Sequence, residues 1–305
     1  IHYDRSWVQQ FEQKLDELGV NYIDNTQLLQ DRRAGGEQVF NKVYNAGHWN
    51  DLGAFYGVNN ILESLSGFFP SIQPNELGDF AVTETLQETL LSSQFPIHEY
   101  EPTFGRLCEL EVKTEEYDAE VARNSQHRGF GYFVNPENVA AGAPKTLVFQ
   151  GSYMNEMGFK FLQTGLGEYI YVHNYENLMD FDYYFNIFQP ECVVVEVAEY
   201  TVNSGYFNAE RVENFSLNPV LTLDDAARQA DKQSLAPQIA EGERLSTLTV
   251  SLPEGTRYAY LLSEGRTFDL IEGEQGWQAS VEKENLSADY TVVAVGADGE
   301  QTRYR

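Results

Sequence analysis

The sequence predicts an α/β protein: a parallel sheet with helices on both faces, followed by a small C-terminal β-sandwich domain. Between residues 145 and 200, three apolar strand-like runs alternate with two helix-like runs. Strands separated by helices at this spacing pair in parallel and are covered on both faces. After residue 245, short strand-like runs are separated by turn residues, which is typical of a small all-β domain.

The first 66 residues contain three helix-like segments. Apolar residues recur at helical spacing from Trp7 to Leu18, and Gly19 follows as a natural end. Residues 25–33 and 48–65 continue the helical pattern. In the last of these, Gly53 and Gly57 lie four residues apart on one face, which predicts close packing against a neighbour.

The alternating region is the clearest part of the sequence. Its strands are predicted at 145–150, 168–174 and 191–200, and its helices at 155–166 and 176–188. We place one domain at 1–205, a polar connector at 206–244 and a β domain at 245–305.

Six strand-like runs fill the β domain, and they begin near residues 245, 257, 266, 276, 289 and 301. Four aromatic residues there can stack on sugar rings, which favours a carbohydrate-binding domain, although aromatic residues in a β-sandwich are more often core. They are Tyr258, Tyr260, Trp277 and Tyr290.

Composition excludes several functions. With 47 acidic and 20 basic residues in 305, the net charge is −27, and such a surface repels nucleic acid and anionic membranes. The two cysteines, Cys108 and Cys192, form no metal or redox motif, and no two of the five histidines have the spacing of metal ligands. No dinucleotide or calcium loop is complete, so we expect neither a metal nor a cofactor.

Ser152 is the candidate nucleophile. It follows an apolar strand and Gly151 and precedes a helix-like run. At such a junction the hydroxyl projects from the edge of the sheet, and backbone N–H groups at the start of the helix can hold an oxyanion. A serine at this position is also an ordinary helix cap.

His48 is the candidate base. It lies in "NAGHWND", residues 45–51, just before the helix-like run that contains the two glycines. The alternative role of His48 is to begin that helix, and His173, at a predicted strand end, is interpreted as a core or edge residue.

Three segments together resemble the SGNH-hydrolase-like proteins of the alginate O-acetyltransferase and DHHW type. They are "YNAGHWNDLGAFYG" at 44–57, "PKTLVFQGSYMNEMGFKFL" at 144–162 and "ECVVVEVAEY" at 191–200. In that family an Asp-x-His-Trp segment precedes a helix, and the serine follows later on a glycine turn, so that His comes before Ser. The resemblance covers roughly residues 1–202.

The resemblance implies Ser152 as nucleophile, His48 as general base and Trp49 as the packing tryptophan of the motif, with Gly151 and Tyr153 on either side of the serine. It implies acyl transfer to, or removal from, hydroxyls of a cell-surface or secreted polysaccharide, and a membrane protein as acyl donor. The protein is then expected outside the cytoplasm, either secreted or anchored through a segment missing from this chain, which begins at Ile1.

One position departs from the family. The aspartate two residues before the histidine falls on Ala46, which cannot orient an imidazole. Asn45 can accept a hydrogen bond from the ring but does not neutralise an imidazolium, and in a serine protease the same Asp-to-Asn change costs about 10⁴ in turnover.

Other acids are candidates to replace the missing aspartate, and the sequence leaves them open: Asp51, Glu196 and Glu199. If none does, we expect weak ester hydrolysis that Ala46→Asp would increase. The alternative function is a catalytically degenerate relative that binds or scaffolds polysaccharide.

Overall fold

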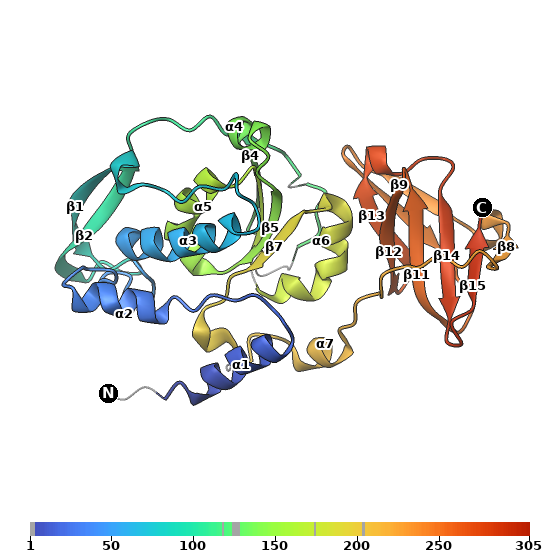
Figure 1. Ribbon diagram of the computed structural model, residues 1–305, viewed down its shortest axis with the longest axis horizontal. Coiled ribbons are helices and arrows are strands. Elements are labelled where there is room, and N and C mark those ends of the chain that lie inside the picture. The colour runs from blue at the N-terminus through green and yellow to red at the C-terminus, as the bar shows by residue number, and fades with distance from the viewer. Residues whose placement is uncertain (1–3, 118, 124–128, 174, 203–204) are drawn as a thin grey trace. The chain divides into compact units, whose positions relative to one another are not determined.

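The computed structural model describes residues 4–117, 119–123, 129–173, 175–202 and 205–305. The chain forms two compact units (Figure 1). The first comprises the described residues of 1–116, 125–175 and 191–207, and the second those of 117–124, 176–190 and 208–305. The protein is a mixed α/β fold with several sheets and helices.

A five-stranded mixed sheet is the centre of the first unit, in the order β3-β4-β6-β5-β7. The three strands predicted from the alternating pattern pair in parallel, with β5 between β6 and β7. The sheet is not wholly parallel, however, because β4 pairs antiparallel with β6 and β3 antiparallel with β4. The strands are β3 (Lys113–Thr114), β4 (Phe130–Val134), β5 (Lys145–Gln150), β6 (Glu168–His173) and β7 (Cys192–Val195).

Helices of the first unit pack into a common core with this sheet. Helix α3 (Asp51–Ser66) contacts α5 (Phe159–Gly165) so closely that a Cβ on Gly165 would lie 2.5 Å from Leu62. Further helices are α1 (Ser6–Glu17), α2 (Thr26–Ala34) and α4 (Pro136–Ala140), with short 3-10 turns η1 (Leu77–Asp79) and η4 (Glu199–Val202). The segment before α5, η2 (Met154–Gly158), is a π-helical stretch.

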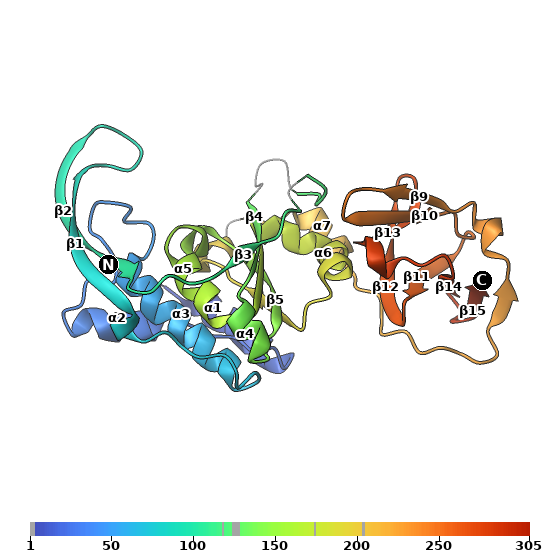
Figure 2. The ribbon, with the colours of Figure 1, turned by 90° about the horizontal axis from the view of Figure 1, so that it is seen from above.

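A two-stranded antiparallel hairpin extends from the core of the first unit (Figure 2). Its strands are β1 (Phe80–Thr89) and β2 (Pro96–Arg106). At its base, Phe80 and Phe104 pack with Phe55 of α3 and Phe161 of α5, at ring-centroid distances of 5.2 to 6.1 Å. Because both strands end in this aromatic cluster, the position of the hairpin is fixed by the core.

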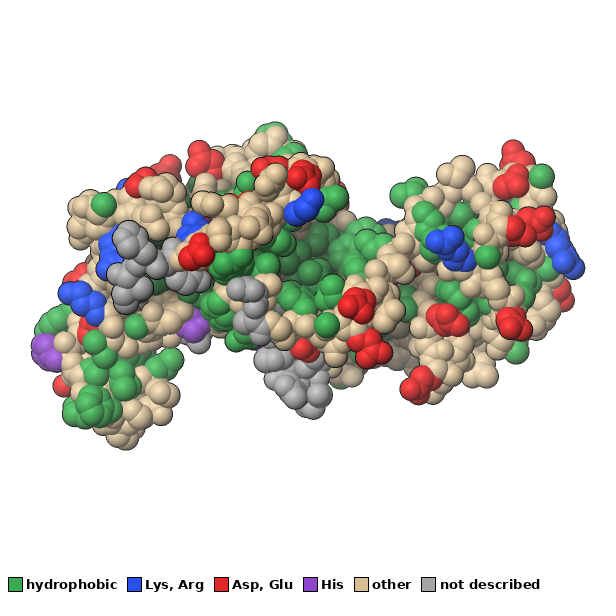
Figure 3. Space-filling model, turned by 90° about the horizontal axis from the view of Figure 1, so that it is seen from below, with side chains coloured by type: hydrophobic (Ala, Val, Ile, Leu, Met, Phe, Trp, Pro, Cys, Tyr) green, Lys and Arg blue, Asp and Glu red, His purple; other side chains and the backbone are tan. Residues whose placement is uncertain are grey.

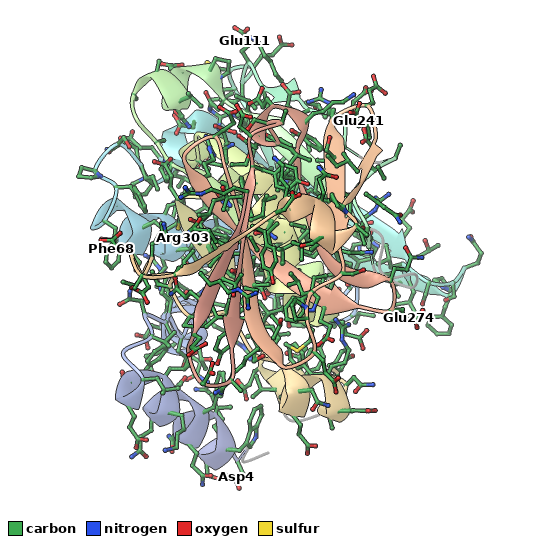
Figure 4. The ribbon with its side chains drawn as sticks, turned by 90° about the vertical axis from the view of Figure 1, so that its right-hand side faces the viewer. Asp4, Phe68, Glu111, Glu241, Glu274 and Arg303 are labelled. Carbon is green, nitrogen blue, oxygen red and sulfur yellow. The ribbon has the colours of Figure 1, made fainter. Side chains whose placement is uncertain are left out.

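The second unit is built on an eight-stranded sheet in the order β8-β15-β14-β11-β12-β13-β10-β9. All neighbours are antiparallel except β8 and β15. Six of its strands coincide with the six predicted runs: β10 (Leu245–Val250), β11 (Thr256–Ser263), β12 (Arg266–Gly273), β13 (Gly276–Glu282), β14 (Thr291–Gly296) and β15 (Gln301–Tyr304). Figure 4 shows their side chains, with Glu274 in the exposed turn between β12 and β13.

The second unit also takes in residues that the sequence placed elsewhere. The predicted connector contributes α7 (Ala209–Asn214), β8 (Arg228–Ala230), η5 (Lys232–Leu235) and β9 (Gln238–Glu241). Helix α6 (Phe181–Phe188), which follows η3 (Tyr175–Asp180), packs on β12 and β13, and η6 (Lys283–Asn285) follows β13. Asn186 fixes α6 there by donating to the carbonyl of Asp269 at 2.8 Å and accepting from its N–H at 2.9 Å.

Two of the four aromatic residues considered for sugar stacking in the β domain are buried. Tyr260 and Tyr290 are 2% and 5% exposed, and the hydroxyl of Tyr260 donates to the carbonyl of Pro219 at 2.7 Å. Both rings therefore belong to the interior. Only Tyr258 and Trp277 keep partial exposure.

On the face that Figure 3 shows, acidic and basic side chains are scattered singly or in small groups. Among the described residues, no helix is long and apolar enough to cross a membrane.

Candidate active site

Ser152 lies at the end of the central parallel strand. Leu147, Val148 and Phe149 of β5 are fully buried, so the strand is fixed in the core up to Gly151. Ser152 is half-buried and is the first residue of the helical segment that continues through η2 into α5. The first N–H groups of a helix have no partner within the helix, so those of Ser152 and Tyr153 are suited to hold an oxyanion.

His48 lies in the loop that leads into α3. Asn50 caps this helix by accepting from the N–H of Gly53 at 3.1 Å. Before it, Asn45 takes a left-handed backbone conformation with φ of 46°, and the N–H of His48 donates to the carbonyl of Asn45 at 3.1 Å. Asparagine adopts this conformation more readily than most other residues. The turn therefore brings the Asn45 side chain back onto the His48 ring.

The structure brings His48 and Ser152 together. The Nε2 atom of His48 lies 2.7 Å from Ser152 Oγ, and its Nδ1 atom lies 2.8 Å from Asn45 Oδ1. An amide oxygen only accepts, so Nδ1 carries the proton and Nε2 presents its lone pair to the serine hydroxyl. This is the tautomer that a general base requires.

Aromatic packing fixes the two halves of the pair against each other. Trp49 Nε1 donates to the carbonyl of Tyr153 at 2.9 Å, and the Tyr153 hydroxyl donates to the carbonyl of Gly47 at 2.8 Å. Burial raises the pKa of Tyr153 to about 12, so its hydroxyl stays a donor. A Cβ on Gly57 would lie 2.4 Å from the Trp49 ring, which explains the close packing predicted for the two glycines of α3.

The three acids considered as replacements for the family aspartate do not contact the imidazole. Asp51 accepts from the N–H of Phe104 at 2.8 Å and pairs with Lys160. Glu199 pairs with Arg5 at 3.2 Å. Their carboxylates are held by donors on other elements, so the expectation that either orients His48 is corrected.

Glu196 supports the serine rather than the histidine. Its Oε2 accepts from the N–H of Gly151 at 2.6 Å. Desolvation raises the pKa of Glu196 to about 7, although the bond from Gly151 opposes the rise. Glu196 therefore fixes the turn that carries the nucleophile.

The residue that orients the ring is three positions before His48, not two. Ala46 is exposed, whereas the Asn45 side chain contacts Nδ1. The left-handed backbone conformation of Asn45 explains why the orienting side chain comes from position 45 and not from position 46, because the turn brings the Asn45 side chain onto the ring.

Sequence reasoning missed Glu99, which supports the histidine loop from strand β2. Its carboxylate accepts from the N–H groups of three consecutive residues: Lys42 at 2.6 Å, Val43 at 2.9 Å and Tyr44 at 2.6 Å. Desolvation opposes ionisation, but these bonds lower the pKa of Glu99 below its usual value. No local pattern signals this role, because the partners are more than 50 residues apart in the sequence.

His173 is the histidine that the sequence placed at the end of a predicted strand. His173 Nδ1 lies 2.9 Å from the carbonyl oxygen of Gln150, at the end of β6. Within the described part of the chain, no group of three or more His, Cys, Asp or Glu residues could hold a metal ion. His127 lies outside the described residues.

Fold and site together define a mixed α/β protein with a serine–histidine pair at the end of a parallel strand. No protein-family model matches the chain, and no curated protein sequence matches it significantly.

Solved structures give distant likenesses. The structure of PatB1 of Bacillus cereus is 14% identical in sequence to this protein, with a TM-score of 0.39. The match covers 54% of this chain and 64% of the PatB1 chain. A DHHW family protein of Eubacterium siraeum is 13% identical over 61% and 66%, also with a TM-score of 0.39. PatB1 with a sulfonyl adduct is 15% identical over 52% and 59%, with a TM-score of 0.35. The chain spans less than two thirds of each, and at these values any function must be argued from the site itself.

Proposed function

We propose that the protein is an SGNH-like O-acyltransferase or esterase that acts on hydroxyl groups of a polysaccharide, with Ser152 as nucleophile and His48 as general base. The observation that carries the proposal is the 2.7 Å contact between His48 Nε2 and Ser152 Oγ, in a tautomer set by Asn45. A nucleophile, a base and an orienting group in hydrogen-bond contact are the parts that acyl transfer requires.

The chemistry follows from this geometry. Ser152 Oγ attacks the acyl carbonyl while its proton passes to His48 Nε2, and the N–H groups of Ser152 and Tyr153 receive the oxyanion. The leaving alcohol takes the proton from His48, and the acyl group remains on Oγ. A sugar hydroxyl or a water molecule then gives its proton to Nε2, attacks the acyl carbonyl and restores the serine.

The substrate and setting belong to the same proposal. The acidic, dispersed surface suits a neutral acceptor better than a polyanion. We propose a cell-surface or secreted polysaccharide as acceptor, a membrane protein as acyl donor and a location outside the cytoplasm, because acetyl groups are added to such glycans there by the family that the sequence resembles. The carbohydrate-binding role of the β domain is also a proposal.

The test is hydrolysis of p-nitrophenyl acetate by the full chain, together with labelling by phenylmethylsulfonyl fluoride. Labelling joins Oγ to sulfur and releases fluoride, so peptide mass mapping identifies the serine that reacts. We expect turnover and a single labelled residue, Ser152, and loss of both in Ser152→Ala. Label on another serine, or equal turnover by the variant, would contradict the assignment.

A second candidate function is supported by one observation: Asn45 offers the ring an amide and no negative charge. A neutral orienter does not stabilise the imidazolium that forms during catalysis, so the pair is poorly equipped for turnover. If wild type and Asn45→Asp are both inert toward acetyl esters while the protein binds oligosaccharide, the protein is a catalytically degenerate binder or scaffold.

A further inference from the structure

A groove begins beside the serine–histidine pair and runs under the hairpin. Its inner part is a cleft of about 280 Å³, lined among others by Asn45, Gln87, Glu101 and Met157. A second hollow of about 580 Å³ continues along the hairpin to Ser92 and its neighbours in the turn. Tyr44, Gln87 and Leu91 line both, so the two hollows are continuous. An elongated groove of this kind suits a chain molecule.

The inner end of the groove is lined by Asn45 and Met157, which adjoin the serine–histidine pair. Asn45 contacts the His48 ring, and Met157 follows Ser152 in the same helical segment. Glu99 fixes the Lys42–Tyr44 loop to strand β2, so that the loop and the hairpin form two walls of one structure. Figure 2 shows the hairpin alongside the loop that leads into α3. Ser152 itself lines neither hollow, so a ligand must extend past Asn45 and Met157 to approach it.

The polar side chains of the groove are held in fixed positions by one another. Gln87 Nε2 donates to Glu101 Oε1 at 2.6 Å, and Asn41 Nδ2 donates to Glu101 Oε2 at 2.5 Å. The Thr103 hydroxyl donates to that of Thr85 at 2.8 Å. Amide, carboxylate and hydroxyl groups have lone pairs beyond these bonds and can bind the hydroxyls of a sugar. Prearranged groups lose little conformational entropy when a ligand binds.

Charge narrows the class of ligand. Of the described residues that line the two hollows, none is Lys or Arg. Glu101 is acidic, and the second acid, Asp51, is paired with Lys160. A phosphate or carboxylate ligand lacks a partner here and meets like charge. A neutral hydroxylated chain meets neither problem.

We propose that this groove binds several neutral sugar units of the acceptor glycan and directs one hydroxyl toward Ser152. The proposal rests on the proposed acyl-transfer function for its direction. The binding itself is a separate property, so the two fail in different experiments.

The test is isothermal titration calorimetry of the full-length Ser152→Ala variant with chitohexaose, cellohexaose and mannohexaose, and with hexagalacturonate as the anionic probe. We expect at least one neutral hexasaccharide to bind at millimolar concentration or tighter and the anionic one not to bind. No binding by any neutral probe, or tighter binding of hexagalacturonate, would overturn the proposal.

Variants locate the binding site. In the Ser152→Ala background, we expect Gln87→Ala to weaken hexasaccharide binding at least fivefold and Glu88→Ala to leave it unchanged. Glu88 is the matched control, because it is the exposed neighbour of Gln87 in the same strand and lines neither hollow. Equal affinities in the two variants would place the sugar elsewhere.

Failure of the groove and failure of the function are distinguishable. If wild type hydrolyses p-nitrophenyl acetate but no neutral hexasaccharide binds, the groove proposal is wrong and the acyl chemistry stands. If a hexasaccharide binds through Gln87 but Ser152 neither reacts with the sulfonyl fluoride nor hydrolyses the ester, the acyl-transfer proposal is wrong and the groove proposal stands.

Discussion

The serine and the histidine of the pair are each supported by a glutamate that accepts from backbone N–H groups, and the two glutamates differ. Glu196 accepts one N–H bond, from Gly151, and desolvation raises its pKa to about 7. Glu99 accepts bonds from three consecutive residues, and these lower its pKa in spite of desolvation. The comparison shows that strong desolvation against one donor raises the pKa of a carboxyl, whereas weaker desolvation against three donors lowers it.

This difference makes the two sides of the site respond differently to pH. The histidine side is held by a carboxylate that stays ionised at neutral pH, whereas the serine side is held by a group that titrates near pH 7. Four variants test the comparison, and their expected effects decrease in the order given.

The largest effect is expected from His48→Gln, which removes the base and leaves both glutamates in place. General-base catalysis contributes about 10²- to 10⁴-fold, so kcat for ester hydrolysis is expected to fall by that factor. The measurement is p-nitrophenyl acetate turnover. His98→Gln is the control, since His98 is exposed on the hairpin. This variant should hydrolyse the ester at the wild-type rate. A fall below tenfold for His48→Gln would show that the two supports matter more than the base.

Asn45→Asp tests the histidine side of the comparison by giving the ring a charged hydrogen-bond partner. Because an amide in place of an aspartate costs about 10⁴ in a serine protease, the reverse change should raise kcat/KM by about 10² to 10⁴. Aspartate also tolerates the left-handed backbone at this position. Ala46→Asp, proposed on sequence grounds, becomes the control because residue 46 is exposed. An increase in Ala46→Asp alone would show that the loop rearranges in solution.

Glu196→Gln tests the serine side through stability. The carboxyl has a pKa of about 4.5 when unfolded and about 7 when folded, so between these values the native state holds the extra proton. Its stabilising contribution is therefore complete below pH 4.5 and is lost as pH rises through 7, a total of about 3 kcal/mol.

The check is urea unfolding at pH 5 and pH 8. We expect wild type to lose more free energy of unfolding between these values than Glu196→Gln does. The exposed Glu88→Gln should behave like wild type. Parallel pH profiles for wild type and Glu196→Gln would mean that Glu196 does not titrate in this range.

The smallest effect is expected from Glu99→Ala, which frees three N–H groups of the histidine loop without touching the ring. We expect roughly a tenfold loss of kcat, because a loosened loop samples the productive geometry less often, as positioning effects of this size allow. Glu99→Gln keeps one acceptor oxygen and should recover part of the loss. Loss of activity without such recovery, together with a lowered melting temperature, would indicate a purely structural role.

The sequence predicts the serine side better than the histidine side. Ser152 lies on a strand, a turn and a helix that are contiguous in the chain, and the pattern of each is local. The same holds for the three parallel strands and the six C-terminal strands. Glu196 lies in the third predicted strand segment, but its bond to Gly151 depends on the pairing of β5 with β7.

The histidine side could be predicted only in part. His48 and a hydrogen bond from its ring to Asn45 could be named from the sequence, but the contacts that fix their loop are distant in the sequence. The hairpin that carries Glu99 lies in a region without clear periodicity, and so do the antiparallel strands β3 and β4. The role of Asn45 depends on a left-handed turn, whereas the sequence pattern directs attention to Ala46. The burial of Tyr260 and Tyr290 depends on tertiary packing, which composition does not reveal.

The sequence separation of His48 and Ser152 has a consequence for folding. The two residues are 104 positions apart, and the hairpin that supports the histidine loop lies between them. Closing so long a loop costs conformational entropy, and only the packing of the whole first unit offsets this cost. Contacts of this kind therefore form slowly. During refolding from denaturant, recovery of esterase activity should therefore lag behind recovery of helical circular dichroism.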